Sequence, residues 1–402
     1  MPRPPALSPQ QTADVFVEKM AAGGDGLAHL PDGRVVFVSG GFTGEQVRVS
    51  LTNIKKDFAR GVVSEVLEAS AQRVSPPCPA VSAGCGGCGW QHIAPMHQSH
   101  LKVGIVEDAL RRTAKREGDD VAFAGAVSPW AYRTSARLAV APDGRVGFRA
   151  GSSHRVVHHG ACAVLHPALS GMLGDLRVEG SDEVSLRVGE DSGERSLWAT
   201  GSAVRVSGCD AAVGQGPHAI VHERVGSAVL RVSAESFFQA GPEAAELLVD
   251  TVGALVGDLT DLTGVVDAYG GVGLFSAALG LRRPVLVESS ASSCADARVN
   301  LAAAGASAHH CTVEAWAPRG APLVIADPAR SGLGAPATAV LAATAAPRIV
   351  LVSCDPVAFA RDVTLLAAHD YELTQIRVLD LFPHTPHVEV VSLFHRVTGR
   401  QR

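Results

Sequence analysis

Four cysteines form the most informative pattern in the sequence. Cys78, Cys85 and Cys88 lie within eleven residues, and Cys162 follows from a distant segment. Glycines between and beside the first three let the backbone turn tightly enough for their thiolates to converge. Four thiolates around one soft centre are typical of an iron–sulfur cluster or of Zn²⁺.

The spacing of these cysteines favours a [4Fe–4S] cluster over zinc. Structural zinc sites more often contain two C-x₂-C pairs, and here only Cys85 and Cys88 have that spacing. The C-x₆-C-x₂-C order also differs from the C-x₃-C-x₂-C of radical S-adenosylmethionine enzymes, which leave one iron open. We therefore expect a closed four-cysteine cluster held by Cys78, Cys85, Cys88 and Cys162, with Zn²⁺ as the alternative.

Cys354 belongs to a second reactive pattern. It ends an apolar run, Asp355 suits the N-cap of a helix, and Pro356 suits the first helical position. A thiol just ahead of a helix N-terminus is expected to lose its proton more easily. The structural alternative is a buried core cysteine.

A carboxylate follows Cys354 after about 35 residues, because Glu389 ends a turn-rich loop at the start of a predicted strand. A cysteine nucleophile and a glutamate base suit an unreactive pyrimidine carbon. The thiolate adds to C6 of uracil, C5 takes a methyl group, and the base then removes the C5 proton so that the thiolate leaves.

Several predicted strands end in residues that could bind a nucleoside. A strand at 264–268 opens into a glycine-rich turn, and Glu288 ends the next strand, 21 residues beyond Asp267. At that spacing a carboxylate reaches a ribose. The strands at 322–327 and 348–353 also end in polar residues. The turn lacks the third glycine of the dinucleotide fingerprint, which favours a smaller adenosine cofactor over NAD.

The elements that carry these residues fall into three parts. Short apolar runs broken by glycine from residue 13 to about 70 predict a small OB-like β-barrel, with a basic–aromatic hairpin at 55–60 that could bind RNA or be a plain solvated turn. A helix is expected at about 101–116, and residues 122–233 have β character. From residue 235 strands and helices alternate, which is the mark of a doubly wound parallel sheet.

Composition sets broad limits. The chain has 402 residues, enough for two or three domains, and its net charge of −5 gives no bulk positive field for nucleic acid. No apolar run reaches 18 residues and no signal peptide starts the chain, so we expect a cytoplasmic protein without membrane contact. Eight cysteines then favour metal binding or catalysis over disulfides.

Taken together, the motifs resemble the RNA (uracil-5-)-methyltransferases, in the branch with a TRAM domain and an iron–sulfur cluster that methylates 23S ribosomal RNA. The likeness runs from about residue 10 to the end of the chain. Besides the barrel and the four cysteines, it rests on residues 237–239 (FFQ), 267–275 (DAYGGVGLF), 327–332 (DPARSG), 353–356 (SCDP) and 387–389 (HVE).

The resemblance implies roles for individual residues. Cys354 is the nucleophile and Glu389 the general base, and four residues contact S-adenosylmethionine: Gln239, Tyr269, Glu288 and Asp327. Asp327 also orients the target uracil. The chain departs from the family at Ala329, where proline is usual, and at Gly270, where relatives often carry cysteine or alanine. Neither change removes a polar group, so activity is expected to persist.

These inferences combine into one expected enzyme. Residues 10–70 form the TRAM barrel, 71–234 a central β-rich domain with the cluster, and 235–402 a Rossmann-like methyltransferase domain on which the helix at 101–116 packs. The expected reaction is methylation of a uridine in 23S ribosomal RNA by a monomer. The alternatives are the T-loop uridine of transfer RNA and, from another class, a non-catalytic zinc-containing RNA-binding protein.

Overall fold

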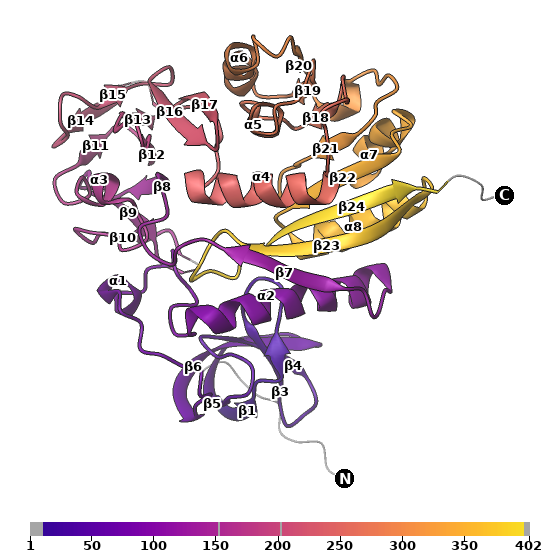
Figure 1. Cartoon of the computed structure of the whole chain (residues 1–402). Coiled ribbons are helices and arrows are strands. Elements are labelled where there is room, and N and C mark those ends of the chain that lie inside the picture. Colours follow the sequence, from indigo (N-terminus) through magenta and orange to yellow (C-terminus); the bar gives the residue numbers. More distant parts are fainter. Residues whose placement is uncertain (1–10, 152, 202, 398–402) are drawn as a thin grey trace.

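The computed structural model describes residues 11–151, 153–201 and 203–397 (Figure 1). A small barrel lies at the bottom of this view, a β-rich domain on the left and an α/β sheet with its helices on the right. No helix among the described residues is long and apolar enough to cross a membrane.

The N-terminal barrel is a six-stranded sheet that curls around its own core. Its strands are β1 (Thr12–Phe16), β2 (Lys19–Met20), β3 (Gly26–His29), β4 (Val35–Ser39), β5 (Gln46–Ile54) and β6 (Phe58–Glu68). They pair in the order β1-β5-β6-β4-β3-β2. On β5, the side chains of Val47, Val49 and Leu51 point into the core while their neighbours are more exposed, which is the period-two pattern of a half-buried strand.

A linking segment joins the barrel to the other two parts. It contains α1 (Pro79–Ser82), α2 (Pro95–Ala109), a π-helical turn at Leu110–Ala114, and β7 (Val121–Ala126). Although this segment precedes the central strands, β7 pairs with a strand of the C-terminal sheet, and α2 packs against that sheet and one of its helices. The helix expected at about 101–116 therefore begins earlier and ends in the π-helical turn.

The central domain is built on a six-stranded sheet with the order β10-β9-β8-β12-β13-β15. Its elements are β8 (Ser135–Val140), β9 (Val146–Arg149), β10 (Val156–Val157), α3 (Pro167–Ser170), β11 (Arg177–Glu179), β12 (Glu183–Val188), β13 (Arg195–Ala199), β14 (Arg205–Ser207), β15 (Gly214–Gln215), β16 (Ile220–Val225) and β17 (Ala228–Ser233). Strands β11 and β14 form a separate pair, and β16 and β17 form a hairpin. That hairpin contacts helices of the C-terminal domain and so connects the two cores.

The C-terminal domain is a sheet covered by helices. Strand–helix alternation predicts its parallel strands, but the expected all-parallel sheet was wrong at one end, where β24 runs antiparallel to β22 and β23. Its elements are α4 (Pro242–Val256), β18 (Val266–Ala268), α5 (Leu274–Ala278), β19 (Val285–Glu288), α6 (Ala291–Asn300), β20 (Ser307–His310), a 3₁₀ turn at Val313–Ala315, β21 (Val324–Ala326), α7 (Gly334–Ala343), β22 (Arg348–Ser353), α8 (Pro356–Ala367), β23 (Tyr371–Asp380) and β24 (Glu389–Arg396). The order of the sheet is β20-β19-β18-β21-β22-β24-β23-β7.

The direction of the strands in this sheet places the chemistry. Strands β20, β19, β18, β21 and β22 are parallel, so their carboxyl ends meet at one edge. Strand β24 runs antiparallel to β22, so its first residue lies at that same edge. In open α/β sheets this edge is where ligands bind.

Candidate functional site

Cys354 and Glu389 face each other at the carboxyl edge of the sheet. The last pair in the β22–β24 register joins Ser353 to Val390, so Cys354 lies opposite Glu389 one step further along. Glu389 is buried, with 4% of its surface exposed, and Cys354 is partly buried. Two side chains separated by 34 intervening residues are therefore placed side by side by strand pairing alone.

A helix N-terminus fixes the backbone beside the thiol. The Asp355 carboxylate accepts hydrogen bonds from the backbone N–H groups of Val357, at 3.0 Å, and Ala358, at 2.8 Å. Pro356 occupies the first turn of α8, where a missing N–H costs nothing. The N-cap expected from the sequence is thus present, and it holds Cys354 at the end of β22.

The electrostatic surroundings of Cys354 differ from the sequence-based expectation. Burial, the Glu389 and Asp327 carboxyls, and a smaller opposing effect of Arg330 together raise the pKa of the Cys354 thiol to about 12. The helix N-terminus does not outweigh these effects, so the expected easier ionisation was wrong for this form of the protein. Like charges and low solvation both disfavour a thiolate here.

Burial also raises the pKa values of the two carboxyls of the site. Burial raises the pKa of Glu389 well above its usual value, and the neighbouring Asp327 adds to the shift. Burial and the nearby Asp267 raise the pKa of Asp327 to about 7. Pairs of carboxyls whose pKa values are displaced in this way are characteristic of active sites.

Sequence reasoning gave no role to Arg330, the one cation of this group. Its guanidinium lies 3.3 Å from Nε2 of His387 and lowers the pKa values of both Cys354 and Glu389. Burial, followed by Arg330, lowers the pKa of His387 to about 4, so that ring is neutral and can accept the hydrogen bond. The signal was present in the sequence, because Arg330 follows Asp327 by three residues in the motif at 327–332.

A pocket beside this site collects three of the four residues expected to bind the cofactor. It is lined by Gln239, Tyr269 and Asp327, together with the glycine-rich turn and the aromatic rings of residues 237 and 238. Tyr269 has a φ of +60°, a backbone conformation that non-glycine residues rarely adopt. Such strain gathers at ligand sites, where the surrounding structure imposes it.

Glu288, the fourth expected residue, does not line that pocket. Its carboxylate accepts hydrogen bonds from the backbone N–H groups of Gly271, at 3.0 Å, and Ser290, at 2.5 Å. It therefore closes the glycine-rich turn from the neighbouring strand. The departure at Gly270 also has a structural reason, since a Cβ there would lie 2.7 Å from the Leu286 side chain.

The loop that leads to Glu389 is anchored by the linking segment. The Gln98 side-chain carbonyl accepts a hydrogen bond from the backbone N–H of His384 at 2.7 Å, and the His384 carbonyl accepts one from the backbone N–H of Trp90 at 2.9 Å. Lys102, fully buried, forms an ion pair with Asp380. Buried pairs of this kind fix one conformation at the cost of desolvation.

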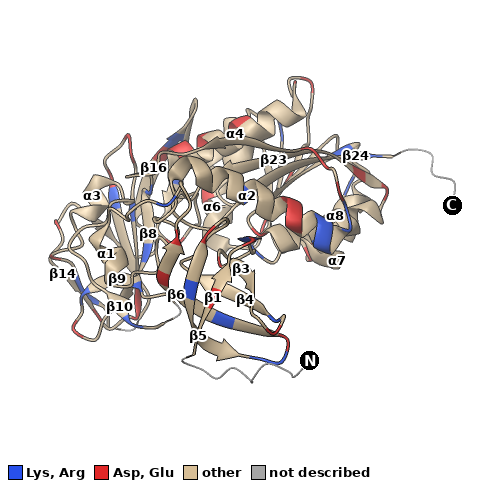
Figure 2. Ribbon diagram, turned by 90° about the horizontal axis from the view of Figure 1, so that it is seen from below, with Lys and Arg blue, Asp and Glu red and all other residues tan. Residues whose placement is uncertain are grey.

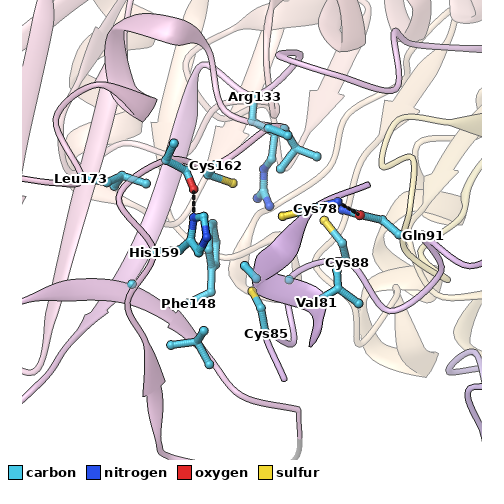
Figure 3. A pocket seen from close by; sticks show the side chains of 17 residues that line it. Cys78, Val81, Cys85, Cys88, Gln91, Arg133, Phe148, His159, Cys162 and Leu173 are labelled. Atoms are coloured by element: carbon cyan, nitrogen blue, oxygen red, sulfur yellow. Dashed lines mark hydrogen bonds between the residues drawn. The ribbon is translucent and has the colours of Figure 1, made fainter. Parts of the chain in front are cut away.

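The four expected cluster cysteines line one pocket in the central domain (Figure 3). Cys78 precedes α1, Cys85 pairs with Ala150 at the end of β9, and the Cys162 N–H donates to the Ser170 hydroxyl of α3 at 2.9 Å. Figure 3 shows the Arg133 guanidinium reaching the space between Cys162 and Cys78. Folding therefore unites two segments that lie far apart in the sequence.

The thiols of this pocket can ionise only if a bound positive group compensates the negative charge of the thiolates. Burial raises the pKa of Cys88 to about 11 and also raises those of Cys85 and Cys162. Among the described residues, no group of three or more His, Cys, Asp or Glu side chains could hold a metal ion as the side chains stand. The cysteines share a pocket without being drawn together around a single ion.

Comparison with known proteins places this architecture. The TRAM domain family matches residues 9–64. An RNA methyltransferase of unassigned target from Corynebacterium efficiens is 32% identical over 415 aligned positions, covering 98% of this chain and 96% of that protein. The 23S rRNA (uracil(1939)-C(5))-methyltransferase of Erwinia tasmaniensis is 31% identical, covering 97% of this chain and 98% of that protein.

A solved structure resembles the fold along almost the whole chain. The tRNA (uracil-54, C5)-methyltransferase of Pyrococcus abyssi, in complex with S-adenosyl-L-homocysteine, superposes with a TM-score of 0.71 at 25% identity, covering 94% of this chain and 99% of that one. The similarity thus includes the barrel, the central domain and the sheet edge. The protein belongs to the RNA (uracil-5-)-methyltransferase family and carries its TRAM domain.

Proposed function

We propose that the protein transfers a methyl group from S-adenosylmethionine to C5 of a uridine in RNA. The observation that carries the proposal is the placement of Cys354 opposite Glu389, at the edge that also bears the pocket lined by Gln239, Tyr269 and Asp327. A thiol and a carboxyl on either side of one base are what addition to C6 and proton removal from C5 require.

The first step is attack by Cys354. Its sulfur adds to C6 of the uracil, and the electron pair of the C5–C6 bond moves toward C5 and O4. Because the thiol holds its proton in the free protein, ionisation has to accompany binding of the base. The thiol proton passes to solvent as the base binds. Protonation of Asp327 helps this ionisation, since it removes one of the like charges that oppose a thiolate.

The second step uses the cofactor pocket, and the third uses Glu389. S-adenosylmethionine would supply the methyl group, with Gln239, Tyr269 and Asp327 as its proposed contacts in the pocket. Glu288, which holds the glycine-rich turn, is the proposed ribose contact from the neighbouring strand. Glu389, which acts here as the free carboxylate, then takes the C5 proton. The C5–H electron pair re-forms the C5–C6 double bond, the sulfur–C6 bond breaks, and the thiolate leaves. A carboxyl with a raised pKa is a better proton acceptor near neutral pH than an ordinary one.

We propose 23S ribosomal RNA as the substrate and the T-loop of transfer RNA as the alternative. The Erwinia tasmaniensis relative, named for a 23S rRNA uracil, supports the first, and the Pyrococcus abyssi structure, named for a tRNA uracil, supports the second. The target base has to leave its stack so that sulfur and methyl donor can approach, which favours a uridine in a loop or bulge.

Incubation with radiolabelled S-adenosylmethionine and total unmodified RNA, followed by sizing of the labelled RNA, tests the proposal. Label in 23S RNA, released as 5-methyluridine on digestion, is the expected result, and label in the transfer RNA fraction would select the alternative. Incorporation into neither, with fully folded protein, would refute the function. A purified Glu389→Gln variant should stall as a denaturant-resistant protein–RNA adduct that disappears when Cys354 is also replaced.

We propose further that Cys78, Cys85, Cys88 and Cys162 hold a [4Fe–4S] cluster with a structural role. They share one pocket, and their buried thiols need a positive centre to exist as thiolates. Only Cys85 and Cys88 have the C-x₂-C spacing typical of structural zinc sites, which favours the cluster over Zn²⁺.

Metal analysis distinguishes a [4Fe–4S] cluster from Zn²⁺ in this pocket. Protein purified without oxygen should be brown and contain about four irons per chain, as a four-thiolate cubane requires. A colourless protein with one zinc per chain would replace the cluster with the zinc alternative. Given its proposed RNA substrate, the protein would work in the cytoplasm, and we propose that it does so as a monomer.

A further inference from the structure

The central sheet has an open face that carries polar and aromatic side chains in two rows. Across β8, β12 and β13, Arg187 pairs with a serine on each side, and Ser185 pairs with Arg137 on one side and Trp198 on the other. The opposite face of β12 buries its apolar residues in the core of the central domain. The open face therefore bears these six residues: Ser135, Arg137, Ser185, Arg187, Ser196 and Trp198.

These six residues form the floor of a cavity of about 350 Å³, which we call the sheet-face pocket. Its walls are Arg133 and the segment 234–238, including Phe237, a residue that is 70% exposed. A cavity of this size accommodates a small ligand. Hydroxyls, guanidinium groups and two accessible aromatic rings are the groups that bind unpaired nucleotides.

The charge of the pocket favours an anion. Burial lowers the pKa of Arg187 to about 10, so this arginine remains charged at neutral pH. One of its N–H groups donates to the Ser236 carbonyl at 2.9 Å, but its Nε and Nη1 have no hydrogen-bond partner among the described residues. Two carboxyls act on Arg187, those of Glu223 on β16 and of Asp296 on α6. Burial raises the pKa of Glu223 to about 7, which weakens its share of the compensation.

The other charged groups around the pocket leave arginine in excess. Arg133, Arg137 and Arg187 line it, against one carboxylate, Glu235. Arg137 also pairs with Glu183 at 3.4 Å, but Arg149 on β9 approaches that same carboxylate more closely, at 2.7 Å. Figure 2 shows that acidic and basic residues are otherwise interspersed over the ribbon, without one basic face.

The sheet-face pocket lies between the two sites described above. Arg133 lines both this pocket and the pocket of the four cysteines. Phe237 and Phe238 line both this pocket and the proposed cofactor pocket. Whatever occupies the sheet face is therefore adjacent to the proposed cofactor pocket, whose Asp327 also acts on Cys354.

We propose that the sheet-face pocket binds an unpaired nucleotide of the RNA substrate beside the target uridine, with its phosphate at Arg137 and Arg133 and its base against Trp198. This assignment rests on the proposed function, which supplies the RNA. A flipped target uridine leaves its neighbours unstacked, and an aromatic platform recovers part of that lost stacking. The serine hydroxyls supply hydrogen bonds to sugar or phosphate.

A matched pair of variants tests the charge. Arg137→Ala and Arg149→Ala each remove one exposed arginine and one ion pair to Glu183, but only Arg137 lines the pocket. With unmodified 23S RNA as substrate, Arg137→Ala should raise the KM for RNA several-fold and reduce the salt dependence of binding by about one ion. Arg149→Ala should change neither, and kcat and the KM for S-adenosylmethionine should stay within twofold in both variants.

A second pair tests the stacking platform. Trp198→Ala should raise the KM for RNA about tenfold, the size expected for one lost base stack, whereas Trp198→Phe should keep most of the affinity. Binding of a single-stranded RNA of about 12 nucleotides, measured by fluorescence anisotropy without cofactor, should follow the same order.

The outcomes separate this proposal from the proposed function. If the wild-type protein methylates RNA and both Arg137→Ala and Trp198→Ala behave like Arg149→Ala, the pocket assignment is wrong and the function stands. If the wild-type protein binds the short RNA through these residues without methylating any RNA, the function fails and the pocket stands. If the folded wild-type protein neither binds the short RNA nor methylates any RNA, both proposals are wrong.

Discussion

The protein has two cysteine sites, Cys354 at the sheet edge and the pocket lined by Cys78, Cys85, Cys88 and Cys162. The two sites differ more in their neighbouring groups than in their burial. Burial raises the pKa of Cys354 and of three of the four pocket cysteines. Around Cys354 the neighbours are two carboxyls and one arginine, held at strand ends. The pocket cysteines lie on loops and a one-turn helix, and their pKa values are affected by one another rather than by acids.

This difference supports the proposed roles, a reactive thiol at Cys354 and ligand thiols in the pocket. Burial alone cannot assign a role, because it disfavours the thiolate in both places. A carboxyl that can exchange a proton makes turnover possible at Cys354, whereas only a cation can stabilise several neighbouring thiolates. The rigid sheet edge positions one sulfur, and the loops would let four sulfurs adjust to the proposed cluster.

The largest expected effect distinguishes Cys354 from the pocket cysteines by single substitutions. Cys354→Ala should reduce methylation by about 10⁴-fold or more, as loss of a nucleophile does, while iron content and S-adenosylmethionine binding stay as in the wild type. Cys88→Ala should lose the iron and the brown colour and should lower the melting temperature. Cys311→Ala, a substitution of a thiol outside both groups, is the control and should leave activity and metal unchanged.

A reversal of this pattern would break the comparison. If Cys88→Ala keeps full iron content and stability, the pocket thiols are not ligands. If Cys354→Ala turns over normally, the thiol does not add to the pyrimidine, and the methyl acceptor has to be sought elsewhere.

A second expected effect concerns the electrostatic cost of the catalytic edge. Because the folded-state pKa of Glu389 is raised above its usual 4.5, its contribution to stability is complete below that value and is lost as the pH rises through the folded pKa. Glutamine does not titrate, so the Glu389→Gln variant does not lose stability in this way as the pH rises. The variant should therefore gain stability over the wild type by up to about 1.4 kcal/mol per pH unit within that window.

Thermal or urea unfolding at pH 5 and pH 8 measures this effect. The advantage of Glu389→Gln should be larger at pH 8, and Glu68→Gln, an exposed carboxylate at the end of β6 on the barrel, should show no such growth. Equal differences at both pH values would mean that Glu389 is ionised in the folded protein. The catalytic edge would then lack the burial-raised carboxyl pKa that makes it similar to the pocket of the four cysteines.

A smaller effect is expected at the link between the two regions. Gln98→Ala removes the side chain that joins α2 to the loop before Glu389, and leaving buried partners unpaired should cost about 1–3 kcal/mol of stability. A looser loop should slow proton removal more than attack, so a larger fraction of protein should be found as RNA adduct during turnover. His100→Ala, an exposed position on the same helix, is the control.

Adduct levels identical in Gln98→Ala and wild type would limit the loop contact to a purely structural role. Loss of stability without any change in the balance of attack and release would give the same answer. Either result would leave the two regions energetically independent.

The sequence by itself determined the three kinds of folding pattern and nearly every residue of the candidate sites. Period-two alternation predicted the barrel that the TRAM match confirms. Strand–helix alternation predicted the sheet of the C-terminal domain, and the N-cap at Asp355 is present as expected. These features depend on neighbours within a few residues, so local patterns contain them.

Only the tertiary structure decided what lies beside what. It set the register that puts Cys354 opposite Glu389 and joined Cys162 to the other three cysteines in one pocket. It added β7 to the distant end of the C-terminal sheet and brought Arg330 and the carboxyls near Cys354, reversing the expected direction of its pKa. Pairing between remote strands and the desolvation that follows depend on the whole fold, and no local pattern of residues records them.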